Sequence, residues 1–262
     1  MKRKITSLIA ILFILTMFSR SRAQYFQFDG MPQNQINKEV EVILKFFGSI
    51  VGGGMYDTAD LHSFGGLDLG LRGVVGIVPD EFKQFPVFSQ ENLVGLAFLH
   101  GSLGLPGPFE LFGRFFYFPL GSDRDLNASP PRAADSRGGV TLIGVGLKYG
   151  LLQLPLLPKV MVMGAYHALL VPDEFDFGTV STVSFKGVVS QSFLLFTLYV
   201  GGGIDFTSLK LNDEFGGDRQ TESLPQATVG LQVRPLPLIH VNGSYNISEF
   251  PSFELGVGIS FR

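Results

Sequence analysis

The last stretch of the chain, residues 252–262, alternates between apolar and polar positions. Its apolar residues Phe253, Leu255, Val257, Ile259 and Phe261 fall on one face, and serine, glycine, glutamate and arginine residues fall on the other. Successive side chains of a β-strand point to opposite faces, so this stretch predicts a strand with one apolar face. The same alternation recurs along the chain and indicates an all-β fold.

Ten such strand-like runs, separated by turn residues, follow one another from Phe64 onward. We interpret runs two, five and seven as apolar on both faces. The predicted runs are residues 64–77, 93–104, 108–119, 138–149, 159–171, 178–189, 193–211, 223–235, 238–248 and 252–262.

The connections between these runs differ in length. Those after runs two, six and eight are tight, whereas residues 79–92, 120–137 and 212–222 form long polar loops after runs one, three and seven. An even number of strands with short turns at one end and longer loops at the other is typical of transmembrane barrels. The sequence therefore predicts a transmembrane antiparallel up-and-down β-barrel of about ten strands, with eight or twelve as alternatives.

The chain begins with an export signal. Lys2, Arg3 and Lys4 precede an apolar run, and Ser21-Arg22-Ala23 provides a small-x-small cleavage site. The apolar run is shorter than the ~20 residues that a spanning helix needs. We therefore expect residues 1–23 to be a signal peptide and the protein to reach the outer membrane of a Gram-negative bacterium.

A short amphipathic helix is predicted next, because apolar residues recur at helical spacing between Ile36 and Val51 and Gly52-Gly53-Gly54 then ends the pattern. Residues 24–62 are thus an N-terminal lead-in and helix, and residues 63–262 are the barrel. Two placements of the helix stay open: against the periplasmic mouth, or inside the barrel as a plug.

Composition excludes several classes of function. Removing the signal peptide takes away five of 20 basic residues and no acidic ones, which leaves 15 bases against 23 acids and a net charge of −8. Nucleic-acid binding needs clustered Lys and Arg, so we expect no nucleic-acid partner. The chain has no cysteine, which removes disulfides, thiolate metal sites and Cys nucleophiles.

The segment after the helix carries a motif: Tyr56, Asp57, Thr58, Ala59 and His62, followed by Gly66-Leu67-Asp68-Leu69. It resembles a family of uncharacterised Gram-negative exported proteins, predicted outer-membrane β-barrels, in which Tyr56 is usually Trp and Asp57 is usually Asn. The resemblance implies a location and no established activity. More distantly, a helix ahead of a glycine-rich barrel is similar to the long-chain fatty-acid transporters, which have more strands.

Charged residues on the polar faces of the runs are expected to line the lumen. They carry both signs, which favours a packed interior or a narrow path over a wide pore. At the closing seam, antiparallel order brings Asp68 toward Arg262 and Arg72 toward Glu254, and we predict that these pairs help to fix the register. The expected lining residues are Asp68, Arg72, Glu110, Arg114, Lys148, Lys186, Arg234 and Glu254.

The four histidines, His62, His100, His167 and His240, lie on different runs without the spacing of metal ligands, so the sequence indicates no metal and no cofactor. His167 comes near Asp173 and Glu174, which is more typical of a solvated rim than of a catalytic group.

The leading function prediction is passive transport or binding of a small ligand, including a hydrophobic one, in contact with outer-membrane lipid. A structural or surface-interaction barrel with a filled lumen, acting through outer loops such as residues 123–137, is the alternative. An outer-membrane hydrolase is third, and we do not expect an enzyme. The sequence leaves the ligand and the oligomeric state open.

Overall fold

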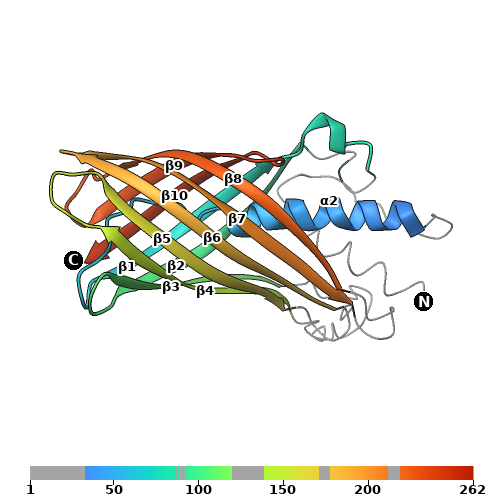
Figure 1. Ribbon diagram of the computed structural model, residues 1–262, viewed down its shortest axis with the longest axis horizontal. Helices are drawn as coiled ribbons and strands as arrows, with labels where there is room; N and C mark the ends of the chain where they lie inside the picture. Colours follow the sequence, from blue (N-terminus) through green and yellow to red (C-terminus); the bar gives the residue numbers. More distant parts are fainter. Residues whose placement is uncertain are drawn as a thin grey trace, which may run out of the picture.

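The computed structural model describes residues 33–85, 88, 92–119, 139–170, 178–211 and 219–261. Ten strands close into one antiparallel barrel in which β1 pairs with β10 (Figure 1). The predicted all-β, ten-stranded, up-and-down barrel with an N-terminal helix is confirmed. The elements are α2 (Gln33–Gly52), β1 (Leu67–Ile77), the 3-10 turn η1 (Asp80–Phe82), β2 (Leu93–Gly104), β3 (Phe109–Pro119), β4 (Gly139–Leu152), β5 (Lys159–Leu170), β6 (Gly178–Phe193), β7 (Phe196–Leu211), β8 (Arg219–Val233), β9 (Ile239–Ile247) and β10 (Ser252–Phe261).

The predicted strand boundaries differ from the structure in β4, β6 and β8, which are longer than predicted, and in β1 and β7, which begin three residues later than predicted. In the β6–β7 hairpin, Phe193 pairs with Phe196, so only Leu194 and Leu195 form the turn. Apolar residues near the turns continue the alternation, and the strands therefore run to the tips of these hairpins.

Runs two, five and seven are not apolar on both faces, which corrects that interpretation. His100 of β2, His167 of β5 and Asp205 of β7 point inward and are buried. On the inward face of β7, Asp205 is preceded by Gly203 and Gly201, which have no side chains. The sequence therefore shows few polar residues on that face. The structure thus gives every strand a distinct inner and outer face.

The distribution of polarity is reversed relative to a soluble protein. Leu69, Phe185 and Leu255 point outward and are more than half exposed, whereas Asp68, Lys186 and Glu254 point inward and are almost fully buried. An apolar outer wall around a polar interior is the arrangement of barrels that sit in lipid, where the closed ladder satisfies all backbone groups.

The two ends of the barrel differ. The connections after β2, β4, β6 and β8 meet at one end, which we call the short-turn end; β1 begins and β10 finishes there, with Leu67 opposite Phe261. The connections after the odd-numbered strands meet at the opposite, long-loop end. The predicted loop residues 120–137 and 212–218 lie outside the described residues, as do residues 1–32 and Arg262.

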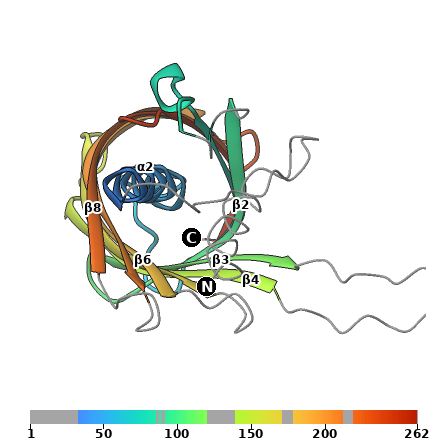
Figure 2. The same ribbon diagram turned by 90° about the vertical axis from the view of Figure 1, so that its right-hand side faces the viewer.

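Helix α2 lies inside the ring of strands and enters from the long-loop end (Figure 2). Phe46 makes edge-on ring contacts with Phe88 and Phe250, at centroid distances of 4.9 and 5.2 Å, and both partners belong to connections at the long-loop end. Lys45 forms ion pairs with Glu41 and Glu249. Partial burial lowers the pKa of Lys45, but the two carboxylates outweigh it and raise the pKa above its ordinary value. Because these partners of α2 lie in connections at the long-loop end, the helix does not lie against the short-turn mouth.

The interior consists of two halves. Toward the long-loop end it is apolar, because Phe46 and Ile50 of α2 pack with Leu96, Phe98 and Leu142 of the wall. Toward the short-turn end, polar and charged wall residues predominate. No helix of the described residues is both long and apolar enough to cross a membrane.

We predict that Phe46→Ala loosens α2 without opening the barrel. The lost ring leaves a cavity between the helix and two loop phenylalanines, which costs about 3–5 kcal/mol. Amide hydrogen exchange should become faster in α2 and stay unchanged in the strands. Phe185→Ala, on the outer wall, is the matched control; equal exchange in α2 of both variants would contradict the docking described here.

Candidate functional site

A linker, residues 53–66, connects α2 to β1 and crosses the polar half of the lumen (Figure 1). At its start, the Gly53 amide donates to the Ser49 carbonyl in the last turn of α2. At its end, Gly65 and Gly66 exchange backbone hydrogen bonds with Gly104 at the short-turn end. The N-terminal segment thus passes through the barrel from one end to the other.

A chain of buried ion pairs joins the linker to the wall. The Asp57 carboxylate of the linker accepts from Arg72 Nη2 of β1 and from Lys148 Nζ of β4, each at 3.2 Å. Lys148 also donates to Glu110 Oε1 of β3 at 2.8 Å. Glu110 Oε2 in turn accepts from the backbone amide and ring Nδ1 of His62, at 2.9 and 2.8 Å. Each buried charge therefore has a partner of opposite sign, as burial requires.

Glu254 of β10 holds the start of the linker. Its carboxylate accepts from the Gly54 amide at 2.5 Å, from Ser244 Oγ at 3.0 Å and from the side-chain amide of Asn246. Gly54 has φ of 67°, in the left-handed region, and a Cβ there would lie 2.9 Å from Arg114 Nη2. Glycine is required at this position by both backbone conformation and space.

Arg114 of β3 caps the helix that precedes the linker. Its Nη1 donates to the Val51 carbonyl at 2.8 Å, and its guanidinium lies 4.0 Å from the centre of the Phe98 ring. The last carbonyls of a helix lack partners within the helix and carry partial negative charge, so a buried arginine stabilises this end.

Tyr56 is the largest fully buried side chain of the linker. The Lys186 ammonium of β6 lies 4.5 Å from its ring centre and also bonds to Asp205 Oδ2 at 3.2 Å. A Cβ at Gly201 of β7 would approach the Tyr56 ring to 2.9 Å. The absence of a side chain at Gly201 therefore makes room for this ring.

Wall side chains also satisfy the backbone of the linker. The Ala59 amide donates to Ser190 Oγ at 2.9 Å, and Gln153 Nε2 donates to the Ala59 carbonyl at 2.8 Å. Asp60 pairs with Lys159 and, at 3.5 Å, with Arg234 Nη2. Thr58 is buried among these groups. The motif residues noted in the sequence thus make the contacts that hold the linker in the lumen.

The space left beside the linker is small. A polar cavity lined by residues that include Asp57, Thr58, Arg72 and Lys148 has a volume of about 20 Å³, which suffices for roughly one water molecule. Within the described residues, no three His, Asp or Glu side chains gather in a way that would hold a metal ion.

Most of the lining residues expected from the sequence contact the linker or α2. Arg72, Glu110, Lys148, Arg234 and Glu254 bind the linker, and Arg114 binds the end of the helix. Asp68 instead accepts from Ser260 Oγ at 2.5 Å and lies 3.5 Å from His240 Nδ1.

The predicted seam pair of Arg72 with Glu254 is not formed. Arg72 stands opposite Gly256, and Asp68 stands opposite Ser260. Glu254 stands opposite Val74, two positions from Arg72, and Arg72 turns inward to Asp57. Arg262 and the predicted neighbours of His167, Asp173 and Glu174, lie outside the described residues.

Sequence reasoning missed Asp205, Ser190, Gln153 and Asp60 as partners. Asp205 is the only acidic residue in its predicted run, and a single carboxylate in an otherwise apolar strand is costly unless it has a buried partner. Asp205 was therefore the residue from which a buried partner could have been predicted. Gln153 lies in a turn and gives no such indication.

A protein-family model described as a family of unknown function, DUF6588, matches residues 88–261. No curated protein matches the chain. Among solved structures, the translocator domain of the autotransporter NalP from Neisseria meningitidis is 12% identical, with a TM-score of 0.39, over 87% of this chain and 98% of that chain. The N-terminal β-barrel domain of Pseudomonas aeruginosa OprF is 11% identical, with a TM-score of 0.34, over 76% and 100%. The Ralstonia pickettii toluene transporter TbuX is 8% identical, with a TM-score of 0.31, over 84% and 99%. At these scores, what each neighbour does stays a property of that neighbour.

We predict that Asp57→Asn frees the linker, because Arg72 and Lys148 lose their shared carboxylate. Breaking a buried ion pair from one side costs about 3–5 kcal/mol. Hydrogen exchange of residues 53–66 should rise, and the urea midpoint in detergent should fall.

The matched test is a double-mutant cycle with Arg72→Met. If the two groups interact directly, the double variant loses less stability than the two single losses together. Additive losses would contradict the ion pair.

Proposed function

Because the chain belongs to DUF6588, a family of unknown function, we propose its function from the geometry of the barrel. It is an outer-membrane barrel whose lumen is closed by its own N-terminal segment, and it acts at the cell surface through its long-loop end. The observation that carries this proposal is the linker, which is bound to the wall along its length by Asp57, Ala59 and His62.

Membrane insertion is supported by the apolar outer wall, on which residues such as Leu69, Leu99 and Leu255 are exposed. In bacterial barrels, short turns face the periplasm and longer loops face outward. This orientation puts the entry of α2 and the long loops at the cell surface. The export signal that the sequence predicts agrees with it.

A closed lumen is supported by the size of the barrel and its contents. Ten strands enclose a narrow lumen. Here α2 lies within the ring of strands (Figure 2). It occupies the apolar half of the lumen, and the linker occupies the polar half. Surface interaction through a filled barrel therefore suits this geometry better than an open pore.

Passive transport or binding of a small ligand, including a hydrophobic one, is the second candidate. One observation favours it: hydrogen bonds and ion pairs hold the linker to the wall, and α2 packs against an aromatic lining that includes Phe98. This function requires the segment to leave the lumen.

We propose no catalytic activity. Ser260, His240 and Asp68 touch one another, but Ser260 Oγ and the Asp68 carboxylate both face His240 Nδ1. A hydrolytic triad needs the serine and the carboxylate at opposite ring nitrogens.

We predict that the full-length mature protein does not conduct ions in planar bilayers. A variant lacking residues 36–54 should conduct little, because the linker from Met55 to His62 stays bound in the polar half. A variant lacking residues 33–62 should conduct strongly, provided that circular dichroism shows its barrel to be folded despite the wall charges left without partners. Steady conductance by the full-length protein, with folding verified by circular dichroism, would contradict the closed lumen.

The orientation can be measured with single cysteines, since the chain has none. Lys38 and Ser63 are both exposed, at opposite ends of the segment that crosses the barrel. On intact cells, a membrane-impermeant maleimide should label Lys38→Cys and should label Ser63→Cys only after the outer membrane is permeabilised. The reverse pattern would overturn the proposed orientation.

A further inference from the structure

The hairpin tips at the short-turn end are rich in exposed leucine. Leu156 in the β4–β5 turn is 96% exposed, Leu194 in the β6–β7 turn is 102% exposed, and Leu236 in the β8–β9 turn is 56% exposed. Neighbouring residues Leu154, Leu157, Leu195 and Leu238 are also about half exposed or more. Several highly exposed leucines at one end of a protein are uncommon where it faces water, and they indicate a contact with lipid or protein.

The charged residues described near these tips point the other way. Lys159 and Arg234 both turn into the lumen mouth, where they pair with Asp60 of the linker. The tips themselves are formed by leucine, proline, glycine, glutamine and serine residues. The described part of this rim therefore presents few charged groups that would disfavour contact with an apolar medium.

The outer face of β6, β7 and β8 changes from polar to apolar along the strands. Toward the long-loop end, outward positions are polar: Ser208 bonds to Thr221 at 2.9 Å and to Arg219 at 3.3 Å. From Val183 and Phe206 toward the short-turn end, the outward residues are mostly apolar or glycine. This transition marks where the hydrocarbon of a bilayer ends on the outer side.

The distance from the transition to the tip matches the thickness of a membrane. Eleven residues separate Val183 from Leu194, which corresponds to about 36 Å along a strand. At a tilt of about 40°, this is about 28 Å along the barrel axis, close to the roughly 25 Å apolar band of outer-membrane barrels. A bilayer that begins at Val183 therefore extends to the leucine tips.

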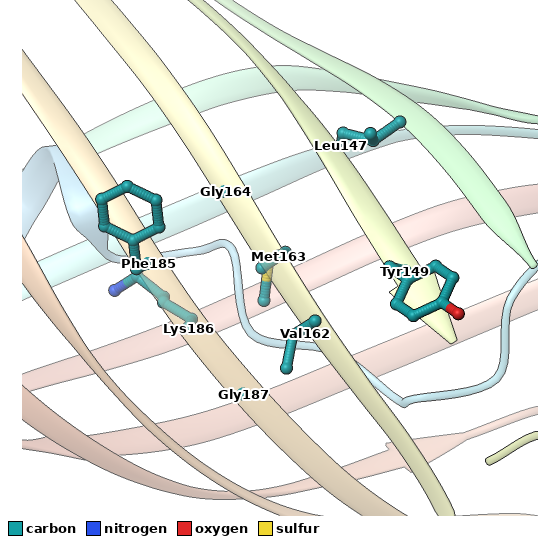
Figure 3. Close-up of a pocket in the computed structure, with 8 residues that line it drawn as sticks. All are labelled: Leu147, Tyr149, Val162, Met163, Gly164, Phe185, Lys186 and Gly187. Carbon is teal, nitrogen blue, oxygen red and sulfur yellow. The ribbon is translucent and has the colours of Figure 1, made fainter. Parts of the chain in front are cut away.

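A groove in the outer wall lies within the same band. It has a volume of about 540 Å³ and is flanked by Tyr149, Val162 and Phe185 over Gly164 and Gly187 (Figure 3). A Cβ at either glycine would meet only ordinary contacts, at 3.7 Å or more. Packing within the barrel thus does not require these glycines, although glycine weakens a strand. The bare backbone leaves space that an acyl chain can occupy.

We propose that the leucine tips of the short-turn end are a lipid-contacting surface, seated at the boundary of acyl chains and headgroups in the periplasmic leaflet. Phospholipid is the occupant, because the tips continue the apolar outer wall, which on β6 is interrupted only by Gln191 between Val189 and Phe193. This inference rests on the proposed membrane location. It adds that the barrel does not project into the periplasm and that its excess strand length lies on the outer side.

The test uses spin labels at single cysteines in phospholipid vesicles, with power saturation by oxygen and by a water-soluble nickel chelate. Leu156→Cys and Leu194→Cys report on the tips. Val200→Cys reports on the middle of the apolar wall, and Lys210→Cys reports on the polar part of β7. Labels at the tips should have a ratio of oxygen access to nickel access well above that of the Lys210→Cys label and below that of the Val200→Cys label.

Each outcome decides one claim. Tip labels as accessible to nickel as the Lys210→Cys label, with the Val200→Cys label protected, would overturn the lipid contact and leave the membrane barrel intact. Nickel access at Val200→Cys as well would overturn the membrane location itself. Tip labels shielded from both reagents would indicate a protein contact, such as a second copy, and would also overturn the proposal.

Discussion

A barrel wall that buries charged side chains needs partners inside the barrel, and here the linker supplies them. Arg72 and Lys148 of the wall share the Asp57 carboxylate, and Glu110 binds His62. Without the linker, these groups would lose partners that buried charges require. The wall and the N-terminal segment therefore belong to one folded unit, in which neither part is satisfied without the other.

The path of the segment follows from where its two ends lie. Helix α2 lies at the long-loop end, while β1 begins at the short-turn end, so the linker runs along the lumen between the two ends. The two halves of the lumen suit this path, since the apolar half takes the helix and the polar half takes extended backbone.

The alternation of side chains has a period of two and is local, which is why ten strands and most inward charges could be predicted from the sequence. The partners of those charges could not, because Asp57 and Lys148 are 91 residues apart and no periodicity links them. An amphipathic stripe suits a barrel mouth as well as a lumen, so the position of α2 also stayed open. The predicted pair of Arg72 with Glu254 was two positions out of register. Alternation shows which face a side chain takes, but it does not fix the register between the first and last strands.

The most direct measurement of the central claim is a disulfide between linker and wall in cells. The Ala59 amide lies 2.9 Å from Ser190 Oγ, so Ala59→Cys with Ser190→Cys should crosslink on mild oxidation. Thr182→Cys with Thr207→Cys, neighbours across the β6–β7 ladder, is the control pair within the wall. Crosslinking of both pairs in the membrane-inserted protein is the predicted result. Crosslinking of the control pair alone would mean that the linker does not occupy the lumen.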